Sequence, residues 1–314
     1  MEKKYIGIDL GGTFIKGGVV DGAGNILLSD KVPTESDKGA GQVAKNIALL
    51  ALSLMERLSL KAADVVGIGM GVPGMIDGKA GNVIYSNNLN WKDFRIAETV
   101  EKLSGLPVKI ANDANVAVLG EVKFGAGKGC ENVVMLTLGT GVGGGVIAEG
   151  VMVEGNKGAG AELGHSVIVA GGEQCTCGRK GCLEAYASAT ALIRDTKRVM
   201  TAHKDSKMWE TYDLDGVSGK TAFDYKDVDP YAKQVVDDYI FHLAVGITNF
   251  ANIFRPEVVL LGGGVCAQGD VLVKPLQALL NRDIFAGDLG PSVPIKIATL
   301  GNSAGLLGAA ALWL

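Results

Sequence analysis

Hydrophobic and polar residues alternate along the chain in the pattern of an α/β protein. Short apolar runs rich in β-branched residues, typical of buried strands, are separated by longer stretches in which apolar residues recur with the period of an amphipathic helix. This periodicity predicts strands at residues 5–9, 16–20, 26–32, 65–70, 108–112, 133–138, 144–148, 151 with 166–169, 258–261 and 293–298. It predicts helices at residues 42–58, 94–103, 114–124, 183–200, 231–254, 273–280 and 304–314.

The same series of elements occurs twice in the chain. Each half begins with a strand that runs into a glycine turn, and each follows the order three strands, helix, strand, helix, strand. Repetition of one supersecondary series is typical of a duplicated unit. We therefore expect two similar lobes facing a cleft, one formed by residues 1–113 with 301–314 and the other by residues 114–300. Residues 201–230 form a polar interruption of the second lobe.

Two lobes of this kind resemble the architecture that actin, hexokinases and Hsp70 share, and the resemblance covers the full length of the chain. The expected fold class is therefore α/β, as a two-lobed actin-like and hexokinase-like (ribonuclease H-like) ATPase fold. In this fold each lobe would repeat the series βββαβαβ around the cleft.

Length and composition are compatible with two domains and narrow the range of partners. The chain has 314 residues, of which 47% are hydrophobic, and its net charge of −4 gives no basic excess for a nucleic-acid partner. The longest apolar run, residues 47–55, is too short to span a bilayer, and the amino terminus lacks a signal-peptide core. We expect a cytoplasmic protein with no membrane partner, in which Cys130 and Cys266 are small buried residues.

Residues 162–184 contain the most unusual chemistry of the chain. Three of the five cysteines, Cys175, Cys177 and Cys182, follow His165 on a glycine-rich loop. Three thiolates and one imidazole are a ligand set for a tetrahedral structural zinc ion. A redox-active Cys-x-Cys pair, a disulfide and a reduced loop without a ligand are the alternatives.

Two glutamates, Glu162 and Glu184, flank this loop. The pattern Glu-x-x-His followed by Cys-x-Cys-Gly-x-x-Gly-Cys-x-Glu resembles the signature of the ROK family (repressors, open reading frames, kinases), in particular its bacterial glucokinase branch. The resemblance implies a sugar kinase that uses ATP and Mg²⁺, carries a structural Zn²⁺, and assembles as a homodimer or homotetramer. It also implies closure of the lobes over the sugar, with residues 113–114 and 301–305 as candidate hinges.

Glycine turns after strands are candidates for phosphate binding. In the first turn, Asp9 precedes Gly11, Gly12 and Thr13. Backbone N–H groups of such a turn can approach phosphate oxygens closely, and the carboxylate beside them can hold Mg²⁺ through water. An ordinary hairpin turn is the alternative, and Lys16 in the following strand is expected to be solvated.

Two further glycine turns follow later strands. The turn that contains Thr140 and Gly141 is too rich in glycine for an ordinary hairpin. It also matches a dinucleotide-binding fingerprint, but such a turn opens a helix, whereas residues 144–148 continue as a strand. Gly263 and Gly264 form the third turn, which the resemblance places beside adenosine; a strand-to-helix corner is the alternative.

Asp113 ends the last strand of the first lobe. It is either the N-cap of the following helix, a common role for Asp, or a catalytic base that accepts the proton of a sugar hydroxyl. The resemblance favours the base, and it implies that the sugar contacts Gly71, Asn88, Asn112, Asp113, Glu162, His165 and Glu184. His165 is thus expected to bind zinc through one ring nitrogen and the sugar through the other.

The function expected on these grounds is ATP-dependent phosphorylation of a hexose, with glucose converted to glucose 6-phosphate. Alternatives are a ROK kinase for N-acetylmannosamine, N-acetylglucosamine, allose or fructose, a polyphosphate donor, or a sugar-sensing protein without enzymatic activity. ROK repressors carry a helix-turn-helix before the first strand, and here that strand is expected to begin at Tyr5. An ATP-driven switch of the Hsp70 or actin kind would lack the cysteine loop.

Overall fold

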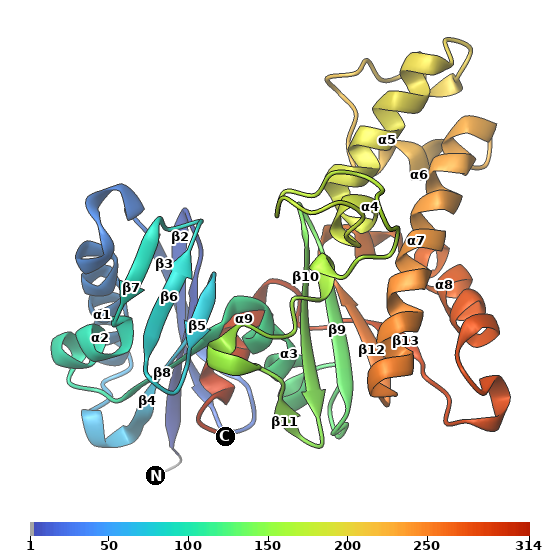
Figure 1. Ribbon diagram of the computed structural model, residues 1–314. Helices are drawn as coiled ribbons and strands as arrows, with labels where there is room; N and C mark the ends of the chain where they lie inside the picture. The colour runs from blue at the N-terminus through green and yellow to red at the C-terminus, as the bar shows by residue number, and fades with distance from the viewer. Residues whose placement is uncertain (1–2) are drawn as a thin grey trace. The chain divides into compact units, whose positions relative to one another are not determined.

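Residues 3–314, which the computed structural model describes, form two five-stranded sheets and one three-stranded sheet (Figure 1). The chain divides into a first unit of residues up to Glu131, Glu149–Ala161 and Thr299–Leu314, and a second unit of Asn132–Ala148 and Glu162–Ala298. The first unit keeps helix α3 (Asp113–Phe124), which the predicted lobe boundary assigned largely to the second lobe. It does so because α3 packs along the C-terminal helix α9 (Ala304–Ala311).

The first sheet brings the carboxyl ends of three parallel strands to one edge. Its strands are β1 (Lys4–Leu10), β2 (Phe14–Asp21), β3 (Ile26–Pro33), β4 (Val65–Val72) and β8 (Val108–Asn112), in the spatial order β3-β2-β1-β4-β8. Strand β1 is antiparallel to β2 and parallel to β4, which in turn is parallel to β8. The register pairs Asp9 with Gly71, and Gly71 with Ala111. Ligand sites of α/β sheets lie outside such carboxyl ends.

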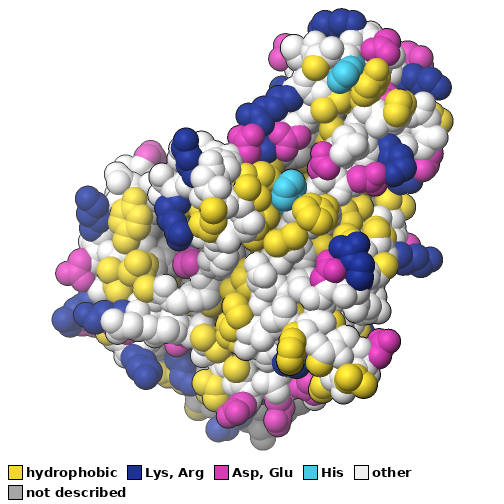
Figure 2. Space-filling model, turned by 45° about the vertical axis from the view of Figure 1, so that its right-hand side comes forward, with side chains coloured by type: hydrophobic (Ala, Val, Ile, Leu, Met, Phe, Trp, Pro, Cys, Tyr) yellow, Lys and Arg dark blue, Asp and Glu magenta, His cyan; other side chains and the backbone are white. Residues whose placement is uncertain are grey.

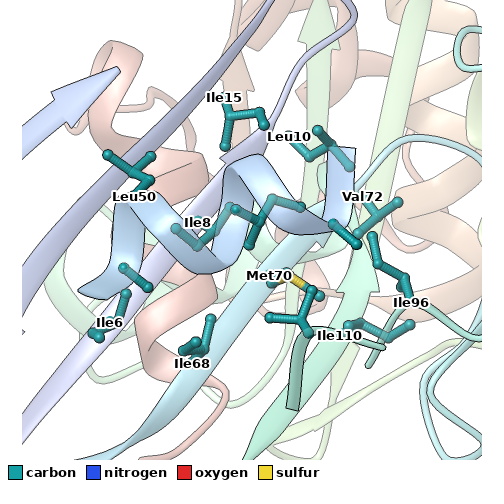
Figure 3. Close-up of a cluster of buried hydrophobic side chains, with 14 of the residues drawn as sticks. Ile6, Ile8, Leu10, Ile15, Leu50, Ile68, Met70, Val72, Ile96 and Ile110 are labelled. Carbon is teal, nitrogen blue, oxygen red and sulfur yellow. The ribbon is translucent and has the colours of Figure 1, made fainter. Parts of the chain in front are cut away.

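One face of this sheet forms the main core of the first unit. Ile6, Ile8 and Leu10 are at most 1% exposed and pack with helices α1 (Ala40–Arg57) and α2 (Ile96–Ser104). Figure 3 shows these side chains among others from β4, β8 and α1. Because alternate residues of a strand point to opposite faces, this periodicity predicts the buried face. Each buried side chain of this size contributes about 1.5–3 kcal/mol.

The opposite face of the sheet carries α9, which approaches at backbone distance. A Cβ atom at Gly69 in β4 would overlap the carbonyl oxygen of Ala309, and one at Gly308 would overlap the carbonyl oxygen of Val116 in α3. The sequence of α9, AGLLGAAA, supplies the small side chains that such an approach requires. The first sheet is therefore covered by α1 and α2 on one face and by α9 with α3 on the other.

A small sheet in the first unit was not predicted from the sequence. Its strands are β5 (Met75–Asp77), β6 (Asn82–Ser86) and β7 (Trp91–Phe94), in the order β5-β6-β7. They are only three to five residues long, so their alternation is too brief to distinguish them from a loop. Asn90 and Asp93 adopt φ of 54° and 49°, values that few residues other than glycine adopt.

The second large sheet repeats the topology of the first. Its strands are β9 (Val133–Leu138), β10 (Val142–Ala148), β11 (Val151–Met152), β12 (Val258–Gly262) and β13 (Ile295–Ile297), in the spatial order β11-β10-β9-β12-β13. In both sheets the first strand in sequence lies between the second and the fourth. The predicted duplication is confirmed. The α-helices of the second unit are α4 (Glu184–Ala187), α5 (Ala189–Ala202), α6 (Thr221–Tyr225), α7 (Pro230–Phe254) and α8 (Asp270–Asp283).

Two predicted elements of this unit were wrong. Residues 166–169 do not form a strand: they make only one isolated bridge, between Val167 and Cys182. The helix predicted at 183–200 is divided at Ser188, whose backbone is extended and whose hydroxyl caps α5 by accepting a hydrogen bond from Ala191 N. Ser is a favoured N-cap residue, so the break had a signal that the helical periodicity concealed.

Within residues 3–314, no helix is both long and apolar enough for a membrane span. On the face of the molecule that Figure 2 shows, acidic and basic side chains are interspersed. The polar segment 201–230 is not structureless, because it contains α6 and buries Met208 and Val217 in a small cluster with Met200 and Ala232.

The close approach of α9 and α3 gives a prediction for stability. Gly308→Ala should destabilise the protein by about 1–3 kcal/mol or more, because the added methyl group overlaps the backbone of α3. Urea unfolding followed by circular dichroism measures the effect. Gly41→Ala, in α1 with open space around it, is the matched control and should be neutral or stabilising. Equal stability of the Gly308 variant and the wild type would contradict the packing.

Candidate functional site

In the first unit, the predicted phosphate turn joins β1 to β2 and is pinned by a buried threonine. Thr34, which is fully buried, donates its hydroxyl to Gly11 O at 2.6 Å and its N–H to Thr13 O at 2.9 Å. Gly12 and Thr13 themselves are exposed. A rigid turn with exposed backbone is suited to contact an anion. No motif in the sequence marked Thr34 for this role.

Asp9 lies beside this turn and is more crowded than the sequence implied. The Lys16 Nζ atom is 3.4 Å from Asp9 Oδ2, since the two residues are opposite each other in the β1–β2 register. A Cβ at Gly305, near the start of α9, would come within 2.9 Å of the Asp9 carboxyl carbon. Lys16 is therefore half-exposed but paired, and not simply solvated as expected.

The junction of β8 and α3 separates the roles of two neighbouring residues. Asn112 is the N-cap of α3, because its Oδ1 accepts hydrogen bonds from Ala114 N at 2.9 Å and from Asn115 N at 3.2 Å. Its Nδ2 donates to Gly74 O at 3.0 Å. The alternative of Asp113 as the N-cap is thus wrong. Asp113 is the first residue of α3, is exposed, and accepts a hydrogen bond from Ala114 N at 2.9 Å.

Gly71 and Asn88 occupy different parts of the first unit. Gly71 is buried in β4, and a Cβ there would lie 3.7 Å from Asp113 Cα, so Gly71 adjoins the start of α3. Asn88 lies in the turn between β6 and β7, where it lines an open cavity of about 570 Å³ with Asp37 and Trp91. The structure therefore brings Gly71, Asn112 and Asp113 together.

In the second unit, the two remaining glycine turns are adjacent. The turn at 139–141 follows β9, and the turn at Gly263 and Gly264 follows β12, which is parallel to β9. Gly263 has φ of 91°, and a Cβ there would overlap Leu138 O, immediately before the first turn. Thr140 and Gly264 are exposed. The second unit thus presents Thr140, Gly141 and both of these glycines along one sheet edge.

Residues at the start of α5 donate hydrogen bonds to the Gly139–Gly141 turn. Ala189 N donates to Gly139 O at 2.8 Å, and the Thr190 hydroxyl donates to Thr140 O at 2.7 Å. The Ala189 contact depends on the break at Ser188, because a continuous helix would have used that N–H group internally. The break that sequence analysis missed therefore places Ala189 against this turn.

The structure brings together the four predicted metal ligands. One ligand atom from each of His165, Cys175, Cys177 and Cys182 lies within 4.8 Å of the others. Cys175 Sγ is 3.7 Å from His165 Nδ1, and Cys177 Sγ is 3.7 Å from Cys182 Sγ. Four ligands at zinc–ligand distances of about 2.0–2.3 Å in a tetrahedron are separated by about 3.5–3.8 Å. The donor set and its spacing fit a structural zinc ion.

The same geometry argues against a disulfide. All five cysteines are free, and the Cys177–Cys182 sulfur distance is far longer than the 2.05 Å or so of a disulfide bond. Burial raises the pKa of the Cys182 thiol to about 12, whereas a hydrogen bond from the Arg179 backbone lowers the pKa of Cys177. A buried thiol such as Cys182 serves as a thiolate ligand when a metal ion compensates its charge. Cys266 is buried as expected, but Cys130 is only half-buried.

The predicted sugar contacts of the second unit surround this cluster. Glu162 is exposed and precedes a 3₁₀ turn, Leu163–His165. His165 turns Nδ1 toward Cys175, which leaves Nε2 as the other ring nitrogen. Glu184 begins α4 and accepts hydrogen bonds from the Thr176 hydroxyl at 2.8 Å and from Val142 N at 3.1 Å. Glu184 therefore contacts both the cysteine loop and the glycine turn.

The other two histidines lie against tyrosine rings. His203 stacks on Tyr231 with ring centroids 3.9 Å apart, and His242 lies against Tyr186 at 4.5 Å. The Tyr186 hydroxyl accepts a hydrogen bond from Glu173 N at 2.7 Å. His242 thereby supports a tyrosine that anchors the cysteine loop.

Comparisons with known proteins agree with the fold and the motifs. The model of the ROK family matches residues 5–314, and the chain belongs to this family. It is 40% identical to a glucokinase of Halalkalibacterium halodurans, over 98% of this chain and 94% of that protein. It is also 29% identical to the xylose repressor of Bacillus subtilis, over 96% of this chain and 75% of the repressor.

A solved structure shows the same architecture. The ROK family glucokinase of Streptomyces griseus, in complex with glucose and AMPPNP, superposes with a TM-score of 0.79 at 35% identity and 98% coverage of both chains. The predicted fold class, a two-lobed α/β fold of the hexokinase type, is confirmed.

The metal cluster gives a second prediction. Purified wild-type protein should contain about one zinc ion per chain, and Cys182→Ala should contain almost none and unfold at lower temperature, because a structural zinc site contributes on the order of 10 kcal/mol to local folding. Inductively coupled plasma mass spectrometry and thermal unfolding measure the two effects. Cys130→Ala, in the first unit, is the control. Wild-type protein without metal, or full metal content in Cys182→Ala, would refute the site.

Proposed function

We propose that this protein is an ATP-dependent sugar kinase that phosphorylates a hexose, with glucose as the preferred acceptor and glucose 6-phosphate as the product. The observation that carries the proposal is the division of roles at the start of α3. Asn112 caps the helix, so Asp113 is not needed for that purpose and stands exposed beside Gly71. Glucokinases 37–40% identical to the chain support the same reaction.

The proposed reaction is direct phosphoryl transfer. Asp113 accepts the proton of a sugar hydroxyl while that oxygen attacks the γ-phosphorus of ATP, and ADP leaves with the bridging oxygen. The turns at Gly11–Thr13 and Gly139–Gly141 present backbone N–H groups to the phosphates. Mg²⁺ bound with ATP supplies charge neutralisation on the phosphoryl oxygens, and Asp9 is the carboxylate placed to hold it.

Recognition of the sugar requires a polar partner for each buried hydroxyl, because an unpaired buried polar group costs about 1–3 kcal/mol. We assign this task to Asn112, Asp113 and Gly71 in the first unit and to Glu162, His165 and Glu184 in the second. We also assign a sugar contact to Asn88, which lies in the turn between β6 and β7. The adenosine is assigned to the turn at Gly263 and Gly264.

Acceptor choice among hexoses depends on details that distinguish similar hydroxyl patterns. N-acetylmannosamine, N-acetylglucosamine, allose and fructose are the alternative acceptors, and polyphosphate is the alternative donor. A sugar-sensing role without catalysis is favoured by one observation, the 29% identity to a xylose repressor. Free cysteines as metal ligands suit a reducing compartment such as the cytoplasm, and we propose a homodimer or homotetramer as the assembly.

The proposed base can be tested with a matched variant. Wild-type protein with ATP and Mg²⁺ should release ADP fastest with glucose in a panel of glucose, mannose, fructose, allose, N-acetylmannosamine and N-acetylglucosamine. Asp113→Asn should lower kcat at least about 100-fold with the preferred sugar, because proton transfer by a positioned base is worth about 10²–10⁴-fold.

Asp270→Asn is the control for this experiment. Asp270 is likewise the exposed first residue of a helix, α8, so it reproduces any effect of removing a negative charge at a helix start. It should leave kcat unchanged. An Asp113→Asn protein with more than a few per cent of wild-type kcat would refute the base, and absence of turnover with every sugar would favour the sensor.

The dual role of His165 gives a further prediction. His165→Ala should lower both zinc content and sugar affinity, because Nδ1 faces the thiols and Nε2 is assigned to a hydroxyl. Metal analysis and equilibrium binding of glucose measure the two losses separately. The control is His203→Ala, which removes a histidine stacked on Tyr231 and should change neither. Loss of only zinc or only sugar affinity would contradict the shared role.

A further inference from the structure

Glu184 links two segments that have different assignments in the proposed function. Its Oε1 accepts a hydrogen bond from the hydroxyl of Thr176, which lies between the ligands Cys175 and Cys177. Its Oε2 accepts a hydrogen bond from the N–H of Val142, the residue that follows the Gly139–Gly141 turn. The carboxylate thus connects the cysteine loop to the glycine turn within the second unit.

The Glu184 carboxylate is packed tightly against the glycine turn. A Cβ atom at Gly141 would overlap Glu184 Oε2, so the carboxylate lies directly against the turn. Ala189 and Thr190 donate hydrogen bonds to Gly139 O and Thr140 O, whereas Glu184 accepts one from Val142 N, at the end of the turn that leads into β10. We therefore expect a shift of Glu184 to act on this end of the turn.

The position of Thr176 depends on the cysteine loop. Both of its neighbours in sequence are predicted metal ligands, and Cys175 Sγ lies 3.6 Å from the same Glu184 oxygen that Thr176 contacts. The residue is exposed, so burial does not account for its orientation. A β-branched side chain has few χ1 rotamers, and a backbone fixed on both sides directs the hydroxyl to one place.

We propose that Thr176 is a positioning residue that couples the metal loop to the nucleotide-binding turn through Glu184. This inference rests on the proposed function, in which the Gly139–Gly141 turn contacts the phosphates of ATP. Thr176 orients Oε1, Glu184 in turn fixes the Val142 N–H through Oε2, and the glycine turn is held ready for the nucleotide before it binds. A carboxylate accepts about four hydrogen bonds, so Glu184 retains capacity for a sugar hydroxyl.

The test removes the Thr176 hydroxyl while keeping its shape. Thr176→Val should retain full zinc content, because Thr176 is not a ligand, but should bind AMPPNP about three- to tenfold more weakly, the size of effect expected for loss of one ordinary hydrogen bond. Thr176→Ser should restore wild-type affinity. Calorimetric titration without sugar measures this affinity independently of turnover.

Thr201→Val is the matched control. Thr201 is an exposed threonine of the second unit whose hydroxyl donates only to the backbone of its own helix, at Lys197 O. It should bind AMPPNP as the wild type does. Wild-type affinity in Thr176→Val, or a loss that Thr176→Ser does not restore, would overturn the positioning role. Loss of zinc from Thr176→Val would also overturn it, because the residue would then act through the metal site alone.

A double variant tests whether the effect passes through Glu184. Gly141→Ala displaces Glu184 Oε2, and its φ needs no glycine. Because Gly141 also lies in the proposed nucleotide-binding turn, the affinity of this single variant is the reference for the double variant. If both changes act through Glu184, the double variant should bind AMPPNP little more weakly than Gly141→Ala alone. Losses that multiply independently would show that Thr176 does not act through this carboxylate.

These outcomes separate the inference from the proposed function. A wild-type protein that neither binds AMPPNP nor phosphorylates a sugar would overturn the proposed function, and the inference with it. A wild-type protein that does both, with Thr176→Val indistinguishable from it, would overturn the inference alone.

Discussion

The backbone-to-backbone packing of α9 on the first sheet is the constraint on which the first unit depends. Side chains normally separate a helix from a sheet, but at Gly69 and Gly308 the carbonyl oxygens of neighbouring elements occupy the space of a side chain. This approach brings the start of α9, at Gly305, against Asp9. Helix α9 thereby completes the surroundings of β1, and its packing helps to fix the edge that carries Asp9, Gly71 and Asp113.

In the second unit, the candidate site residues of the cysteine loop are not held in place by close helix packing. Residues 162–184 contain only a 3₁₀ turn and isolated bridges, and the cluster around Cys175 and Cys182 buries few apolar side chains. Such a segment cannot hold carboxylates in place by hydrophobic burial, which is the main favourable term in folding. The four clustered ligand atoms of His165, Cys175, Cys177 and Cys182 fit a metal ion, which would supply that rigidity. The first unit thus uses glycines such as Gly69 and Gly308 for close helix packing, and the second unit places three of its cysteines in one loop.

Sequence patterns predicted the parts of this structure that repeat over several residues. The long strands, the glycine turns after β1, β9 and β12, and the four clustered ligands each have a periodic or compositional signature. What escaped prediction depends on single side chains. Ser188 ends a helix although its neighbours favour one, Thr34 pins a turn that lies 21 residues earlier in the chain, and β5–β7 are too short to show alternation. Their effect comes from tertiary contacts that local patterns do not encode.

The neighbouring residues Asn112 and Asp113 show how structure separates stability from chemistry. Sequence analysis offered Asp113 as the possible cap of α3, and Asp is as good a cap as Asn. In the structure Asn112 accepts hydrogen bonds from Ala114 N and Asn115 N and donates one to Gly74 O, whereas Asp113 shares only the first of these N–H groups. An additional carboxylate at the first helical position gains only about 0.3–1 kcal/mol from the helix dipole. That gain is small and available at any helix start, whereas Asp113 stands at the sheet edge shared with Asp9 and Gly71. The position of Asp113 at this edge, more than its contribution to stability, suits the proposed role of proton acceptor.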